Sequence, residues 1–136
     1  MFRMQRQFLR GGVQMARILI VDDSPSQLVG MRRTVEKLGH QVVTAEDGAA
    51  GVETAKRELP DLILMDVVMP NLNGFQATRT IAKDPKTSHI PIILVTTKDQ
   101  DTDRVWGLRQ GAKAYVTKPI DEAELTRTIN EYLPAG

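Results

Sequence analysis

Short apolar runs alternate with longer amphipathic stretches five times along this chain, and that alternation limits the possible fold more than any other feature. The apolar runs predict strands, and the residues that follow each of them repeat with helical periodicity. The predicted strands cover residues 17–21, 41–45, 62–66, 92–95 and 114–117. Three of these runs are nearly all apolar, as expected for parallel strands covered on both faces.

The stretches between the predicted strands carry signals for helix ends. Ser24 suits the N-terminal cap of the first helix, Pro25 suits its first turn, and Gly39 suits its end. In the second stretch, Val52 and Leu59 are predicted to lie on the buried face of a helix. The predicted helices cover about 25–38, 49–58, 74–84, 101–110 and 121–133.

Strict alternation of strands and helices implies right-handed crossovers and an α/β fold with a doubly wound sheet. Five strands of this length suit the flavodoxin-like (βα)5 arrangement, with a parallel sheet in the order 2-1-3-4-5. Sheets of this kind bind ligands beyond the carboxyl ends of the strands, where the first and third strands lie side by side.

Length and composition are those of one small globular domain. The chain has 136 residues, of which 41% are hydrophobic and 26% are charged, and it contains no cysteine for disulfides or thiolate metal sites. Residues 1–14 carry three arginines and no acid and are predicted to be an N-terminal extension, which leaves 15–136 as the domain, with a small negative charge. We therefore expect no nucleic-acid partner, no membrane insertion and a cytoplasmic location.

Polar residues come at or directly after the ends of four predicted strands, and these ends share one edge of the sheet. They are Asp22 and Asp23, then Asp66, then Thr96 and Thr97, and finally Lys118. Three carboxylates at close range repel one another unless a cation joins them, and oxygen ligands suit Mg²⁺. One carboxylate can act as a nucleophile toward phosphorus, while Lys118 and a threonine hydroxyl can bind the phosphoryl oxygens.

Each of these residues also has an ordinary structural explanation. An aspartate pair before a helix is about as often a cap as a ligand, and Asp66 precedes a turn sequence. Thr96 suits a hydrogen-bonded hydroxyl at a strand end, and most lysines such as Lys118 are solvated. Their joint placement at four strand ends favours a functional site.

Four segments resemble bacterial two-component receiver domains: ILIVDD (18–23), DVVMPNLNG (66–74), VTT (95–97) and YVTKP (115–119). The resemblance covers residue 15 to about residue 133 with nearly regular spacing. It implies a response regulator that accepts a phosphoryl group on Asp66 from a histidine kinase. Such a protein is a phosphoacceptor in signalling and not an enzyme, apart from weak self-phosphorylation and self-dephosphorylation.

The resemblance also implies roles for individual residues. Asp23 and Asp66 would bind Mg²⁺ directly, Asp22 would bind it through water, and the backbone carbonyl of Val68 would complete the protein ligands. Thr96 would contact the phosphoryl group.

At the fifth strand, the resemblance implies three further features. Lys118 would contact the phosphoryl group, and the Lys118–Pro119 bond would be cis. Tyr115 would be the aromatic switch residue, with an exposed phenol that turns inward after phosphorylation; the alternative is an ordinary half-buried strand residue. The signal would leave through the face of the fourth helix, fifth strand and fifth helix.

Two further segments, 72–79 and 95–107, resemble stand-alone regulators of type IV pilus twitching motility. This likeness implies a chemotaxis-like histidine kinase as the phosphodonor and control of pilus extension or retraction. A phosphate sink, or control of another cytoplasmic pathway, is the alternative for the same kind of domain.

Three other function classes fit the residues less well. A phosphatase that uses an aspartyl-phosphate needs a substrate-covering cap and a second aspartate two residues past the nucleophile, where this chain has Val68. A flavin or nucleotide binder needs a glycine-rich or hydroxyl-rich loop after the first strand, where this chain has Asp-Asp-Ser-Pro. A receiver that no longer accepts phosphate is disfavoured by the intact set of site residues.

Three residues outside the strand ends are assigned no chemistry. His40 and His89 are predicted to lie at the surface, because neither belongs to a recognisable ligand motif. Trp106 lies beside Val105 and Leu108 and is predicted to pack into the core, with a partner-facing role as the alternative.

Overall fold

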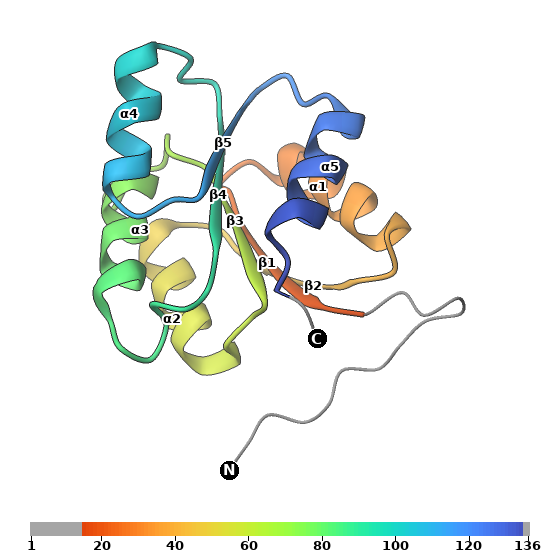
Figure 1. The fold of residues 1–136 in the computed structure, drawn as a ribbon, viewed down its shortest axis with the longest axis horizontal. Helices are drawn as coiled ribbons and strands as arrows, with labels where there is room; N and C mark the ends of the chain where they lie inside the picture. Colours follow the sequence, from red (N-terminus) through yellow and green to blue (C-terminus); the bar gives the residue numbers. More distant parts are fainter. Residues whose placement is uncertain (1–14, 135–136) are drawn as a thin grey trace.

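The computed structural model describes residues 15–134, and within them five strands alternate with five helices (Figure 1). The strands are β1 (Arg17–Val21), β2 (Gln41–Ala45), β3 (Leu62–Met65), β4 (Ile92–Thr96) and β5 (Ala114–Thr117). The helices are α1 (Pro25–Lys37), α2 (Gly48–Glu58), α3 (Gly74–Lys83), α4 (Asp101–Arg109) and α5 (Glu122–Tyr132). The predicted extension over 1–14 lies outside the described residues.

All five strands are parallel and follow the predicted order β2-β1-β3-β4-β5. In the centre of the sheet, Ile18 of β1 pairs with Val42 of β2 on one side and with Leu62 of β3 on the other. The carboxyl ends of β1, β3, β4 and β5 therefore meet at one edge, and the prediction of a flavodoxin-like doubly wound sheet is confirmed.

Helices α1 and α5 cover one face of the sheet, and α2, α3 and α4 cover the other (Figure 1). Alternate residues of β1 serve the two faces: Ile18 and Ile20 belong to the cluster with α1 and α5, whereas Leu19 and Val21 belong to the other cluster. All four side chains are fully buried. Each such side chain contributes about 1.5–3 kcal/mol through its removal from water.

Side-chain caps fix where the helices begin. The hydroxyl of Ser24 accepts a hydrogen bond from the Gln27 N–H, so the predicted cap of α1 is present. At α5, the carboxylate of Asp121 accepts from two N–H groups of the helix. Sequence reasoning overlooked Asp47, which caps α2, and Asn73, which forms a capping box at the start of α3.

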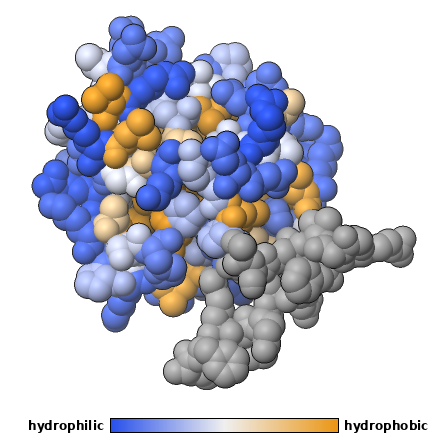
Figure 2. Space-filling model, viewed as in Figure 1, coloured by the Kyte–Doolittle hydropathy of each residue, from blue (hydrophilic) through white to orange (hydrophobic). Residues whose placement is uncertain are grey.

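Two apolar residues predicted to be buried lie at the surface. Leu59 ends α2 in a left-handed conformation (φ 45°) and is 41% exposed, so it leaves the buried face of that helix. Trp106 is 49% exposed, because Gly107 takes the position that faces the sheet. A Cβ on Gly107 would lie 2.6 Å from Leu94 Cδ1, so a larger side chain there would have to displace Leu94. Figure 2 shows apolar side chains at the surface where α4 lies.

His40 is buried, contrary to the prediction of a surface position, whereas His89 is exposed as predicted. The Nδ1 atom of His40 accepts a hydrogen bond from the Ala16 N–H at 3.0 Å, just before β1 begins. Burial lowers the pKa of His40, and the nearby Asp61 carboxylate opposes this in part. The imidazole therefore stabilises the fold in its neutral form.

This arrangement predicts how stability depends on pH. The folded-state pKa of His40 lies below its unfolded value of about 6.5, so its contribution is complete above pH 6.5 and is lost as pH falls through the folded-state value. His40→Gln should remove a dependence of up to about 1.4 kcal/mol per pH unit in urea unfolding between pH 4.5 and 7. His89→Gln is the matched control and should keep the wild-type slope. The same slope in wild type and His40→Gln would contradict this role.

Candidate functional site

The backbone brings Asp22 and Asp66 to the same edge of the sheet. The Asp66 N–H donates to the Val21 carbonyl at 2.9 Å, and the Asp22 N–H donates to the Ala45 carbonyl at 3.1 Å. These bonds continue the parallel pairing one residue past β1 and β3. Both carboxyl groups are consequently placed by the sheet itself.

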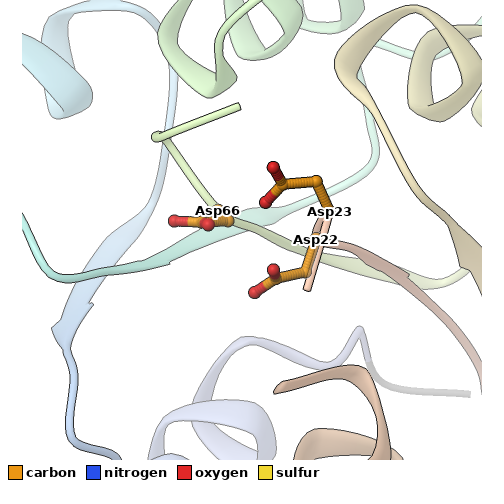
Figure 3. Close-up of side chains that lie close together, drawn as sticks. All are labelled: Asp22, Asp23 and Asp66. Carbon is orange, nitrogen blue, oxygen red and sulfur yellow. The ribbon is translucent and has the colours of Figure 1, made fainter. Parts of the chain in front are cut away.

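Asp22, Asp23 and Asp66 form an acidic cluster in which one carboxylate oxygen from each residue lies within 4.8 Å of the others (Figure 3). Asp22 is fully buried, Asp66 is 6% exposed, and Asp23 is exposed at the rim. The three carboxylates predicted to converge are therefore together, although they come from two strands about 40 residues apart in the chain.

Lys118 provides the positive charge of the cluster. Its Nζ atom lies 2.7 Å from Asp22 Oδ2 and 3.6 Å from Asp66 Oδ2, and its side chain is 8% exposed. The Lys118 N–H donates to the Thr96 carbonyl at 2.8 Å, which fixes the residue at the end of β5. The Lys118–Pro119 bond is cis, as predicted.

The electrostatics of the cluster remain unbalanced despite Lys118. Burial raises the pKa of Asp66; the Lys118 ammonium lowers it in part, and the negative charge of Asp22 raises it again. A further cation would relieve this repulsion. The donor set consists of carboxylate oxygens, which are the ligands of Mg²⁺ in proteins, so the residues present fit that ion.

Thr96 and Val68 lie next to Asp66. Thr96 is fully buried at the end of β4, and its hydroxyl is close enough to the Asp66 carboxyl to help lower that pKa. Thr97 is exposed, so only one hydroxyl of the predicted pair faces the cluster. The Val68 N–H donates to Asp66 Oδ1 at 3.4 Å, while its side chain points into solvent; the role of its carbonyl as a ligand stays a prediction.

Tyr115 lies inward rather than at the surface. The residue is 9% exposed, and its hydroxyl donates to the Lys98 carbonyl at 2.6 Å. The sequence predicts an exposed phenol, whereas the structure places the Tyr115 side chain inward. Sequence reasoning also missed Arg104, which lies over the Tyr115 ring at 5.3 Å from its centroid, because this contact joins a helix to a strand.

The acidic cluster and the lysine opposite it can be compared with known families. Residues 18–130 match the model of the response regulator receiver domain. The chain belongs to this family. Receiver domains accept phosphoryl groups in signalling and are not a catalytic family. Within residues 15–134 the receiver has no helix long and apolar enough to span a membrane.

Individual relatives agree with this assignment. The receiver is 61% identical to Protein PilH of Pseudomonas aeruginosa over 88% of this chain and 98% of the relative. The chemotaxis protein CheY4 of Vibrio cholerae superimposes with a TM-score of 0.82 at 30% identity, over 88% of this chain and 99% of the other. The receiver domain of the sensor histidine kinase PA1611, also from P. aeruginosa, has a TM-score of 0.81 at 33% identity, over 88% and 98% of the two chains. The PA1611 structure holds a magnesium ion in its active-site cleft.

The backbone of Asp66 and Val67 packs against Gly74 and leaves no space for a side chain there. A Cβ there would lie 2.0 Å from the Asp66 carbonyl oxygen, so Gly74→Ala must displace the loop that carries the carboxylate. We expect a loss of about 1–3 kcal/mol in the free energy of unfolding, measured with urea. In the matched control Gly30→Ala, the new Cβ meets no atom within 4 Å, and α1 should gain about 0.5–1 kcal/mol. Equal stability of Gly74→Ala and Gly30→Ala would show that the loop accommodates the new Cβ without loss of stability, contrary to this prediction.

Proposed function

We propose that this protein is a single-domain response regulator that accepts one phosphoryl group on Asp66 from a histidine kinase. The observation that carries the proposal is the position of the Asp66 carboxyl: it lies 3.6 Å from the Lys118 ammonium and beside the Thr96 hydroxyl, within an acidic cluster. A nucleophilic oxygen thus has two groups next to it that can bind an incoming phosphoryl group.

The contacts favour Asp66 over its two neighbours as the nucleophile. Both oxygens of Asp22 are in short contacts, with the Ser24 N–H at 2.9 Å and Lys118 Nζ at 2.7 Å. The oxygens of Asp66 have longer contacts, at 3.4 Å and 3.6 Å, so their lone pairs are more available. Asp23 is exposed at the rim, which suits a ligand for an ion that enters from solvent.

The acidic cluster would hold Mg²⁺ through Asp23, Asp66 and the Val68 carbonyl, with Asp22 acting through water. When bound, Mg²⁺ supplies positive charge that offsets the carboxylates and a ligand position for a phosphoryl oxygen. The magnesium ion in the PA1611 receiver domain, at 33% identity, supports this assignment.

The residues of the chain itself account for the transfer step. A carboxylate oxygen of Asp66 forms a bond to phosphorus while the phosphorus–nitrogen bond of the kinase phosphohistidine breaks, and the imidazole keeps the electron pair. Lys118 pairs with the phosphoryl charge, and the Thr96 hydroxyl donates to a phosphoryl oxygen. The carbonyl of Thr96 anchors the backbone of Lys118, so both groups act from fixed positions.

The similarity to PilH supports a role in type IV pilus twitching motility, with a chemotaxis-like kinase as phosphodonor and the cytoplasm as the expected location. The signal would leave through the face formed by α4, β5 and α5, with Thr96 at the end of β4 and Tyr115 of β5 as the switch pair. A phosphate sink is the second candidate, because such a receiver needs the same site and no downstream target.

The assignment of Asp66 predicts the outcome of a labelling experiment. Acetyl phosphate with Mg²⁺ should add one phosphoryl group to the protein, seen as a single mass increase in intact mass spectrometry, and Asp66→Asn should abolish the increase. Asp47→Asn is the matched control, since it makes the same change at a helix cap where asparagine serves equally well, and it should label normally. Equal labelling of Asp66→Asn would place the nucleophile elsewhere.

Metal binding can be tested separately from phosphorylation. Mg²⁺ should raise the melting temperature of the wild-type protein, and Asp23→Ala should weaken the apparent affinity at least about tenfold because a direct ligand is lost. Glu46→Ala removes an exposed acid that follows β2 at the same edge of the sheet and should leave the affinity nearly unchanged. If Asp23→Ala bound Mg²⁺ as tightly as the wild type, this result would contradict the proposed ligand set.

A further inference from the structure

Tyr115 is hydrogen-bonded through its phenol and through its backbone carbonyl to residues 98–104, which lead into α4 and form its first turn. The phenol donates to the Lys98 carbonyl at 2.6 Å, and the Tyr115 backbone carbonyl accepts from an Arg104 guanidinium N–H at 3.4 Å. The same guanidinium covers the ring, with its central carbon 5.3 Å from the ring centroid. Arg104 thus touches both the side chain and the backbone of the tyrosine.

The chemistry of this contact explains why an arginine suits the position. A cation within about 6 Å of an aromatic centroid is attracted by the negative face of the ring. The guanidinium is planar and carries several N–H groups, so it can lie on the ring and donate to a carbonyl at the same time. A lysine at the same position would keep the charge but lose this geometry.

Helix α4 also approaches the ring through its backbone at Gly107. A Cβ on Gly107 would lie 3.2 Å from Tyr115 Cδ2 and 3.3 Å from Phe75 Cε1, which is tighter than ordinary contact. The tyrosine ring is consequently enclosed by Arg104 and by the bare backbone at Gly107, one helical turn apart.

The acceptor of the phenol is attached to the same helix. Lys98 Nζ lies 3.7 Å from Asp103 Oδ1, and Asp103 Oδ2 accepts the Gln100 N–H at 3.2 Å. The loop that presents the Lys98 carbonyl is therefore joined to the first turn of α4. Tyr115 is held by α4 directly through Arg104 and indirectly through this loop.

We propose that Arg104 is a positioning residue for Tyr115, which holds the ring inward and makes the position of the tyrosine depend on the position of α4. The inference rests on the proposed function in one respect, since Tyr115 borders the face through which the signal would leave. Because Arg104 contacts both the ring and the backbone of Tyr115, its loss should free the ring. Arg104 has no contact with the acidic cluster among those described, so phosphorylation of Asp66 should stay intact.

The test compares three variants in the full chain, with Tyr132→Phe as the common background so that Tyr115 carries the only remaining phenol. The variants are Arg104→Ala, Arg104→Lys and Arg109→Ala. The last removes an exposed arginine from the final turn of the same helix and serves as the matched control. Two quantities are measured by NMR on ring-labelled tyrosine: line broadening by a dissolved paramagnetic agent at pH 7, and the pKa of the phenol.

In Arg104→Ala, broadening of the Tyr115 ring signals should increase several-fold, and the phenol pKa should fall from about 12 toward its ordinary value of 10, since burial is the main cause of the raised value. Asp103, Asp99 and Asp66 also raise this pKa, whereas Arg104 lowers it. Loss of the Arg104 charge without movement of the ring would therefore raise the pKa. Arg104→Lys should recover part of the protection, and Arg109→Ala should match the background protein.

Two results would overturn the role of Arg104: unchanged broadening in Arg104→Ala with a pKa at or above the background value, or the same increase in Arg109→Ala. Labelling with acetyl phosphate and Mg²⁺, read by intact mass, separates this outcome from the proposed function. All variants should label like the wild type, and loss of labelling in Arg104→Ala alone would also overturn the role. No labelling of the wild type would contradict the proposed function, while the tyrosine comparison would still decide the role of Arg104.

Discussion

Repulsion among three carboxylates at one edge of the sheet is the constraint on which the site depends. Their oxygens lie within 4.8 Å of one another, and two of the three side chains are buried, so water screens the charges poorly. Lys118 offsets part of the repulsion from 2.7 Å and 3.6 Å, yet the pKa of Asp66 stays raised. The three carboxylates therefore favour the binding of a cation. Lys118 is placed to pair with a negatively charged group that enters the site.

The same lysine connects the acidic cluster with the surface of the domain. Its backbone N–H is bound to the Thr96 carbonyl, and the Thr96 hydroxyl accepts the Lys98 N–H. The Lys98 carbonyl in turn accepts the phenol of Tyr115, against which Arg104 of α4 lies. These contacts form an unbroken physical route from the carboxylates to α4. A change of a few kcal/mol at one end is enough to shift a two-state equilibrium at the other.

The sequence predicts the features that depend on local pattern. The strand order and the convergence of Asp22 with Asp66 follow from alternation and from the rule that parallel strands end at one edge. The errors concern residues whose environment is decided by distant parts of the chain. His40 is buried because its acceptor nitrogen meets the Ala16 N–H, 24 residues away. Trp106 is exposed because the next residue, Gly107, takes the position where α4 closely approaches Leu94 of β4 and Tyr115 of β5.

The most direct test of Asp66 as the phosphoacceptor locates the phosphoryl group chemically. After treatment with acetyl phosphate and Mg²⁺, borohydride reduction converts a phosphorylated aspartate into homoserine, and peptide mass mapping identifies the residue. We expect homoserine at position 66 in one peptide, with Asp22 and Asp23 unchanged. Reduction at Asp22 or Asp23, or a phosphoryl group on a hydroxyl or histidine side chain, would contradict the assignment of Asp66 as the phosphoacceptor.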